Sequence, residues 1–119
     1  MEQIEIYFSE DNELTEYEAI NKGYRNDVYI KINMNIFKVN IYDSVRLIQD
    51  FETEIENYGY FSIEPNIILV KEVKKEEIVK IIAYLYNEKY FNSIKPISDF
   101  DIKNFKLVKT LSGEKPHPA

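Results

Sequence analysis

Val28-Tyr-Ile-Lys-Ile-Asn-Met-Asn-Ile-Phe-Lys-Val-Asn-Ile-Tyr42 is the stretch that decides the fold. Apolar and polar residues alternate in both of its halves, which is the period of a strand with one buried face. The residues between the halves, Asn33 to Asn35, tolerate the left-handed backbone conformation that a tight turn needs. The stretch therefore predicts a β-hairpin, and its expected inward-facing residues are Val28, Ile30, Ile32, Met34, Phe37, Val39 and Ile41.

The segment before the hairpin predicts one more strand and then an acidic stretch. Apolar residues alternate with polar ones over residues 4–8, as in a strand with one buried face. Residues 9–18 contain five carboxylates and no basic residue, and only Leu14 and Tyr17 could anchor them. We expect a loop or a short, poorly packed helix there, followed by a turn at Gly23.

An amphipathic helix is predicted after the hairpin. Asp43-Ser44 can accept the free amide protons of its first turn, and Gly59 is a good left-handed terminator. At about 100° per residue, one arc of this helix is apolar and comprises Leu47, Ile48, Phe51, Ile55 and Tyr58. The opposite arc has Arg46 as its cation and carries Asp50, Glu52, Thr53, Glu54 and Glu56. Like charges four residues apart repel weakly, so helix stability alone would not select this arrangement.

The remaining sequence completes the predicted fold. The continuous apolar run Ile67 to Val70 indicates a strand buried on both faces in the middle of the sheet. A second helix is expected over Lys74–Phe91 and an edge strand over 104–110. This order predicts an α+β fold, with a mostly antiparallel sheet and two helices packed on one face. Residues 1–111 would form a single domain and residues 112–119 a flexible C-terminal tail.

Length and composition limit the class of protein. The chain has 119 residues, the length of one ordinary domain, and it contains no cysteine. A disulfide framework and a thiolate metal site are therefore excluded. No N-terminal run resembles a signal peptide, and no apolar stretch is long enough to span a bilayer. We therefore expect a cytoplasmic protein.

Residue types suited to catalysis are scarce. The one histidine, His117, lies between prolines in the expected tail, where nothing would orient it as a general base. The three glycines are too widely spaced to form a phosphate-cradling loop. The carboxylates of Asp11-Asn12-Glu13 and Asp99-Phe100-Asp101 lack the spacing and the turn glycine of a calcium loop. We expect no catalytic activity, no cofactor and no bound metal.

The net charge of −6 is unevenly distributed along the chain. Residues 1–70 carry fourteen acidic and five basic residues, a net charge of −9, whereas residues 71–119 carry seven and ten, a net charge of +3. An acidic half repels nucleic acid and anionic lipid, and it attracts basic partners. The lysines at the start of the second helix are interspersed with glutamates, so we interpret them as a solvated helix face rather than a nucleic-acid site.

Two acidic stretches, with tyrosines beside them that could anchor a partner, form the candidate binding surface. Its residues are Glu10, Asp11, Glu13, Glu16, Tyr17, Glu18 and Tyr24 in the first stretch, and Asp50, Glu52, Glu54, Glu56 and Tyr60 in the second. An ordinary surface mixes charges of both signs, and these stretches lack compensating cations. A dispersed face that keeps the protein soluble would explain the same charge. The sequence leaves open whether the two stretches form one surface.

The run from Phe37-Lys-Val-Asn-Ile-Tyr through the amphipathic helix to Asn66-Ile-Ile-Leu-Val-Lys-Glu-Val-Lys-Lys-Glu-Glu-Ile-Val-Lys-Ile-Ile resembles the core of small bacterial immunity proteins. These proteins accompany polymorphic toxins and contact-dependent growth inhibition toxins. The resemblance covers about residues 28–95 and rests on the element order and on the passage from strand to helix at 66–91. It implies a non-catalytic protein that binds one cognate toxin domain, often a basic nuclease, and blocks its active site. Carboxylates would steer the encounter and imitate phosphate, and aromatic side chains would supply affinity.

Two other classes of function remain open at this point. A different interaction module, such as a phage or mobile-element inhibitor or a subunit of a larger assembly, would suit the tyrosine-rich surface, above all if the protein self-associates. A small enzyme or metal-binding protein that uses carboxylates alone would melt at a higher temperature with calcium or magnesium. The sequence leaves the oligomeric state open.

Overall fold

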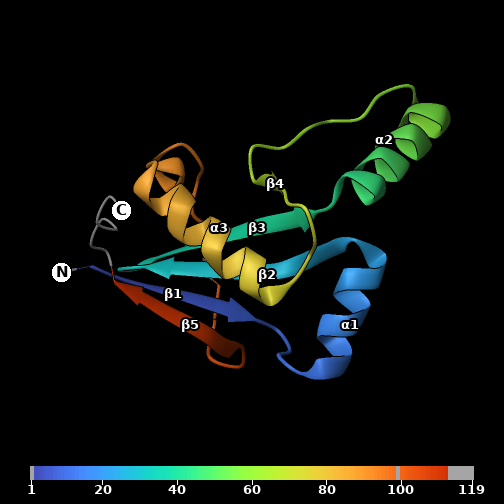
Figure 1. Cartoon of the computed structure of the whole chain (residues 1–119). Coiled ribbons are helices and arrows are strands. Elements are labelled where there is room, and N and C mark those ends of the chain that lie inside the picture. The colour runs from blue at the N-terminus through green and yellow to red at the C-terminus, as the bar shows by residue number, and fades with distance from the viewer. Residues whose placement is uncertain (1, 99, 113–119) are drawn as a thin grey trace.

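The computed structural model describes residues 2–98 and 100–112. Within this part of the chain it has five strands, three α-helices and one short 3-10 helix (Figure 1). In chain order these are β1 (Gln3–Phe8), α1 (Glu13–Lys22), β2 (Tyr24–Ile32), β3 (Asn35–Tyr42), α2 (Ser44–Tyr58), β4 (Ile67–Leu69), α3 (Lys75–Asn87), η1 (Tyr90–Asn92) and β5 (Lys106–Ser112). The fold is therefore α+β, as predicted. Asp99, the predicted tail beyond residue 112 and His117 lie outside the described residues.

The strands of the described chain form one mixed sheet in the order β4-β3-β2-β1-β5. The pairings of β1 with β2, β1 with β5 and β2 with β3 are antiparallel, whereas β3 and β4 run parallel. The predicted hairpin is confirmed, because Ile32 of β2 pairs with Asn35 of β3. Asn33 in the turn has a φ of 56°, the left-handed conformation that asparagine accepts more readily than a branched residue.

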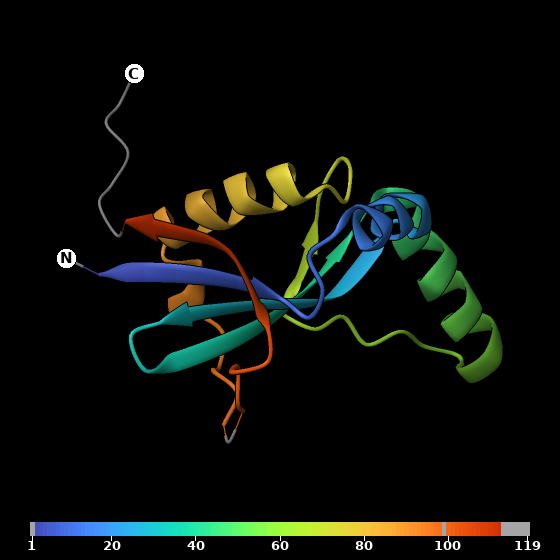
Figure 2. The same cartoon turned by 90° about the horizontal axis from the view of Figure 1, so that it is seen from below.

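One face of the sheet is apolar, and α3 lies across it (Figures 1 and 2). The alternation in the sequence explains this face, because every second residue of a strand points to the same side. Ile78 and Ile82 of α3, four residues apart, are buried against it. The sheet residues of this core are Ile4, Ile6, Phe8, Val28, Ile30, Ile32, Phe37, Val39, Ile41 and Ile68. Met34, predicted to face inward, lies in the hairpin turn and is exposed.

The opposite face of the sheet carries a smaller aromatic cluster. The segment between η1 and β5 crosses this face (Figure 2), and its Ile97 pairs with Ile36 of β3. Phe100 stacks on Tyr29 with ring centroids 4.5 Å apart, and Phe105 meets the same ring edge-on at 4.8 Å. The two faces of the central strands are thus covered by different parts of the chain.

The position of α2 corrects the prediction that two helices pack on one face. The ends of α2 are as predicted, since the Asp43 side chain accepts a hydrogen bond from the Arg46 N–H and Gly59 is left-handed with a φ of 84°. The helix nevertheless projects away from the sheet (Figure 1), and none of its side chains is buried by the described residues. Because α3 already covers the apolar face, the crossover between the parallel strands β3 and β4 carries α2 outward.

For the acidic stretch we predicted a loop or a short, poorly packed helix, and the structure has the helix. This helix, α1, is capped by the Asn12 side chain, ends at the left-handed Gly23, and has Ala19 as its one residue buried within the described part of the chain. The run Ile67 to Val70 was predicted for the middle of the sheet, but β4 is a three-residue edge strand. Its Leu69 is exposed, because β4 pairs with β3 alone and residues at alternate positions face opposite sides.

The C-terminal elements follow the predictions with shifted boundaries. The second predicted helix ends as α3 at Asn87, and η1 then brings Phe91 into the core, 5.3 Å from the ring of Phe37. The predicted edge strand is confirmed as β5, which pairs with β1. β5 includes Ser112, which the sequence analysis assigned to the tail.

Candidate partner-binding surface

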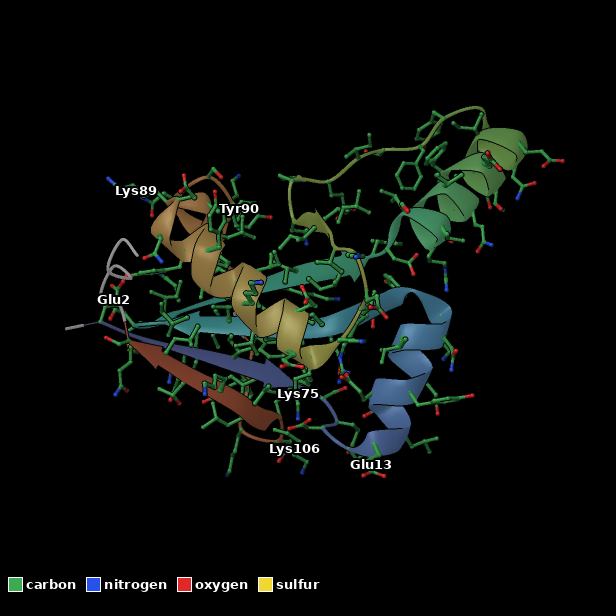
Figure 3. The ribbon with its side chains drawn as sticks, in the orientation of Figure 1. Glu2, Glu13, Lys75, Lys89, Tyr90 and Lys106 are labelled. Carbon is green, nitrogen blue, oxygen red and sulfur yellow. The ribbon has the colours of Figure 1, made fainter. Side chains whose placement is uncertain are left out.

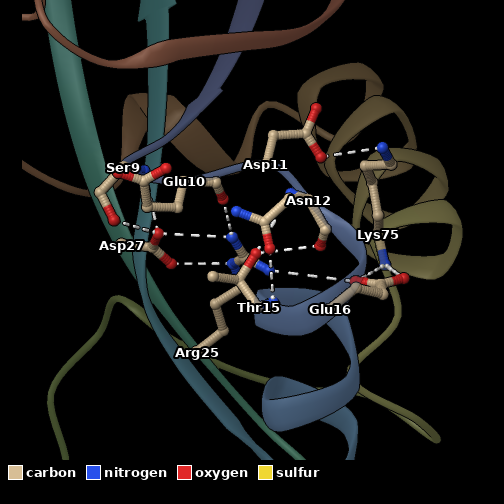
Figure 4. Close-up of polar contacts among 9 residues, drawn as sticks. All are labelled: Ser9, Glu10, Asp11, Asn12, Thr15, Glu16, Arg25, Asp27 and Lys75. Carbon is tan, nitrogen blue, oxygen red and sulfur yellow. Dashed lines mark hydrogen bonds and ion pairs between the residues drawn. The ribbon is translucent and has the colours of Figure 1, made fainter.

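The first acidic stretch, residues 10–18, is attached to β2 through a buried arginine (Figure 4). The Arg25 side chain donates from Nε to Oδ1 of Asp27 at 2.8 Å and from Nη2 to the carbonyl oxygen of Glu10 at 2.6 Å. Its guanidinium carbon lies 3.7 Å from the centroid of the Phe8 ring. Glu10 is therefore held through its main-chain carbonyl oxygen, and the residue as a whole remains exposed to solvent.

Asp27 holds the other side of this arginine. Burial works against the charged carboxylate, but hydrogen bonds from Ser9 and the positive charge of Arg25 outweigh it and hold the pKa of Asp27 below its ordinary value. Ser9 donates to Asp27 from its backbone nitrogen at 2.9 Å and from Oγ at 2.6 Å. Arg25 and Asp27 thus form a structural ion pair, in which each charged side chain has a partner of opposite charge.

Two carboxylates of the same stretch contact α3, Asp11 from the segment before α1 and Glu16 from α1 itself. Both oxygens of Glu16 accept the backbone N–H of Lys75, at 2.9 and 3.2 Å, and Asp11 pairs with Lys75 Nζ at 2.9 Å. Lys75 is the first residue of α3, and Lys74 before it supplies no capping side chain. Glu16 therefore caps α3 from another helix. The sequence carries no signal for this role, because Glu16 and Lys75 are 59 positions apart.

The other predicted contact residues of the first stretch divide into exposed and engaged side chains. Glu13 and Tyr17 of α1 are exposed, and neither side chain has an ion pair or hydrogen bond to another described residue. Glu18 is exposed and pairs with Lys22 at 3.6 Å. This part of α1 therefore retains some capacity for a contact.

Tyr24 does not serve as an exposed anchor. Its ring lies 4.6 Å from that of Tyr42, and the guanidinium carbon of Arg46 lies 5.1 Å from its centroid. Burial, together with Tyr24 and Asp50 nearby, raises the pKa of Tyr42. These rings form the base on which α2 leaves the sheet.

Residues 44–64, which we call the α2 arm, comprise α2 and the segment that returns from its end. The base of the arm is fixed against the end of α1. The Asp43 N–H donates to the carbonyl oxygen of Gly23 at 2.9 Å, and Arg46 Nη1 donates to that of Lys22 at 3.3 Å. The approach is so close that a Cβ on Gly23 would lie 2.5 Å from the Asp43 carboxylate oxygens. These contacts set the direction in which the arm leaves the body.

The second acidic stretch lies on the α2 arm. Asp50 is paired with Arg46, whose Nε donates to Oδ1 at 2.9 Å. Glu52, Glu54 and Glu56 are exposed, and none forms an ion pair or a side-chain hydrogen bond with another described residue. Their charge is therefore uncompensated within this part of the chain.

The apolar side of the α2 arm is also open to solvent. Phe51 is half-buried against Phe61 of the return segment, with ring centroids 6.2 Å apart. The exposed large apolar side chains of the arm are Val45, Ile48, Ile55, Tyr58, Tyr60 and Ile63, with exposures between 44% and 80%. An amphipathic helix normally buries this side against the core. Tyr60 is the predicted tyrosine anchor that lies in this patch.

The two acidic stretches lie at the same end of the sheet but do not merge. Glu13 marks the end of α1 that is far from α2 (Figure 3), whereas Glu52, Glu54 and Glu56 follow the first two turns of α2. The junction between the helices holds Lys22 and Arg46, which are both cations. The structure therefore presents two separate acidic groups, and among the described residues α2 carries three unpaired glutamates, whereas most carboxylates of the first group are engaged.

Other kinds of site have little support in the described residues. They contain no cluster of three or more His, Cys, Asp or Glu side chains that could hold a metal ion. Across residues 2–98 and 100–112, no helix has the length and apolar character needed to cross a membrane. A hollow of about 420 Å³ beside the hairpin turn and the end of α3 includes Asn33 and Lys89 in its lining, but none of the predicted contact residues lines it.

Comparison with known proteins adds no family to this description. No protein-family model, no curated protein and no solved structure matches the chain. The geometry and charge of the α2 arm are therefore the basis on which a function is proposed.

Proposed function

We propose that the protein is a non-catalytic binding protein of the immunity type, which neutralises a cognate toxin domain by covering its active site. The observation that carries this proposal is a helix that projects from the sheet with Glu52, Glu54 and Glu56 uncompensated. Such carboxylates slightly destabilise the free helix through like-charge repulsion. Their position on a projecting element suits contact with another molecule.

The charge favours a basic partner. Carboxylates on a protruding surface accelerate encounters with a cationic surface and repel nucleic acid. The active site of a nuclease must bind phosphates, so cationic groups surround it, and carboxylates can occupy it in place of phosphate. Inhibition of this kind requires occupancy and no catalytic group in the inhibitor. A toxin that attacks intracellular nucleic acid would meet this protein in the cytoplasm, which is the compartment we propose.

The proposed contact surface is smaller than the sequence prediction. Asp11 and Glu16 are engaged with Lys75, and Tyr24 with Tyr42 and Arg46. Asp50 is likewise engaged with Arg46, so the remaining candidates on the arm are Glu52, Glu54, Glu56 and Tyr60. Those at its periphery are Glu10, Glu13, Tyr17 and Glu18. We propose that the arm residues make the main contact.

Calorimetric titration against the toxin domain encoded by the neighbouring gene tests this proposal. We expect a one-to-one complex with a Kd on the order of nanomolar, which weakens as salt rises from about 50 to about 500 mM because salt screens surface charges. The same toxin should lose its activity at equimolar protein. An absence of binding at micromolar concentrations would contradict the proposal.

Two triple variants that remove the same charge distinguish the effect of the arm's carboxylates on association from the effect of the protein's net charge. E52Q/E54Q/E56Q should slow association about tenfold at low salt and have little effect at high salt. E72Q/E76Q/E88Q removes the same charge from exposed positions on and beside α3 and should change the association rate by less than about twofold. Equal losses in both triple variants would show that net charge, rather than the arm, steers the encounter.

A further inference from the structure

The unpaired carboxylates do not explain why the α2 arm also exposes an apolar side. We propose that the arm inserts this side into an apolar groove of the toxin domain whose rims carry Lys and Arg. The inference rests on the proposed function and identifies the part of the arm that supplies the affinity.

Two helices of the same chain differ in how far their apolar sides are buried. α2 and α3 each have one apolar side. Ile82 of α3 is fully buried, whereas Ile48 and Ile55 of α2 are 44% and 48% exposed. A contiguous exposed apolar patch with a polar rim is typical of an interaction site. The arm has the pattern of a packed helix, yet the described residues cover its apolar side only in part.

Three of the four exposed large apolar residues of α2, Ile48, Ile55 and Tyr58, lie in one stripe, whereas Val45 in the first turn lies on the side of Glu52. Ile48 and Ile55 are two helical turns apart and so share a side, and Tyr58 follows about one turn later. Phe51 lies between the two isoleucines and is held by Phe61. Tyr60 and Ile63 extend the exposed apolar surface into the return segment. Anchors at these spacings are those of a helix that binds in a groove.

The carboxylates beside the stripe determine the chemistry of that groove. At about 100° per residue, Glu52 and Glu56 lie on one side of the stripe and Glu54 on the other. A second copy of the chain would bring like charges together along a shared apolar seam, and these would repel. Lys and Arg on both rims of a groove would pair with them instead. The charge therefore favours a basic partner over self-association.

The fixed base of the arm favours insertion without rearrangement. The contact between Asp43 and Gly23 and that between Arg46 and Lys22 hold the first turn of α2 against the end of α1. A helix held in this way loses little conformational freedom on binding. Buried apolar side chains contribute more to affinity than screened surface ion pairs, which act mainly on the association rate.

Binding of the full chain to the same toxin domain, measured for Ile55→Ala and Tyr58→Ala, tests the insertion. Each variant should weaken binding about tenfold or more, chiefly through faster dissociation. Tyr84→Ala is the matched control, because Tyr84 is a helical tyrosine of similar exposure, 62% against 69% for Tyr58. It should change the Kd by less than about twofold. The thermal unfolding of all three variants should resemble that of the wild type, because none of these side chains is buried by the described residues.

The outcomes distinguish this inference from the function on which it rests. Wild-type binding with unchanged affinity in both arm variants would overturn the insertion and leave the proposed function standing. An absence of wild-type binding would overturn both. Light scattering should show a monomer in the absence of toxin, and a dimer that Tyr58→Ala dissociates would mean that a second copy covers the stripe. Slower hydrogen exchange along α2 in the complex is the expected independent support.

Discussion

Arg25 and Asp27 lie two residues apart on β2, and their side chains meet at 2.8 Å between Nε and Oδ1. The pair lies in the part of β2 between Arg25 and Val28 where the pairing with β3 shifts register. The same guanidinium lies over Phe8, reaches the carbonyl of Glu10 and lies 3.9 Å from Glu16. This arginine therefore connects two strands, the loop between β1 and α1, and α1 itself.

Asp27→Asn should destabilise the protein by about 2 kcal/mol near neutral pH, because a buried guanidinium loses the nearer of its two carboxylate partners. The pKa of Asp27 in the folded protein lies below its ordinary value of 3.8, so its carboxylate stabilises the fold above that pH. This contribution is lost as the pH falls through the lower, folded-state pKa. Urea unfolding of variant and wild type should therefore converge in acid.

The control for this prediction is Asp11→Asn. Asp11 also pairs with a cation, Lys75, but both side chains are more exposed than Arg25. Loss of the ion pair between Asp11 and Lys75 should lower the free energy of unfolding by less than about 1 kcal/mol. The prediction would be contradicted if the free energies of unfolding of Asp27→Asn and wild type differed in strong acid as much as they do near neutral pH.

Glu16→Gln should destabilise the protein by about 1 kcal/mol, because the carboxylate of Glu16 caps the N-terminus of α3. Glu18→Gln is the matched variant on the same helix, and its exposed pair with Lys22 should be worth less than about 0.5 kcal/mol. Chemical unfolding of both variants measures the difference. Equal stabilities would contradict the capping role of the Glu16 carboxylate.

Gly23→Ala should destabilise the protein by about 1–2 kcal/mol more than Gly59→Ala. Both glycines have a left-handed φ, 69° and 84°, so alanine is strained at either position. A Cβ at Gly23 would also meet the Asp43 carboxylate at 2.5 Å and displace the cap of α2, whereas at Gly59 nothing lies within 4 Å. Thermal unfolding should rank the two variants in this order, and the reverse order would contradict it.

Ile55→Ala should change the free energy of unfolding by less than about 1 kcal/mol, because Ile55 is half-exposed and alanine favours helix. Ile82→Ala should cost about 2–5 kcal/mol, because Ile82 is fully buried in the core. Equilibrium unfolding of the two variants gives the comparison. A large loss at Ile55 would mean that α2 is packed in the free protein.

The sequence predicted the elements whose signals are local. The hairpin, the cap at Asp43 and the terminator at Gly59 depend on residues within a few positions of one another, and the structure confirms them. The buried alternation of β1, β2 and β3 is equally local, because the period of two is a property of the strand.

The candidate surface could be predicted only in part, because the partner of each charge is a matter of tertiary structure. The sequence proposed Asp11 and Glu16 as contact residues for a partner, yet in the fold both are attached to Lys75. Composition alone could not show that the carboxylates of α2 are better candidates for a partner contact than Asp11 and Glu16. Only the fold shows which anions have cations beside them.

Taken alone, the sequence determined the class of the fold, the ends of α2 and the amphipathic character of α2 and α3. Only the tertiary structure decided that the apolar side of α3 is buried while that of α2 is exposed. The physical reason is that periodicity states which side of a helix avoids water but not what covers it. In this protein α3 covers the apolar face of the sheet, so the apolar side of α2 remains open to a partner.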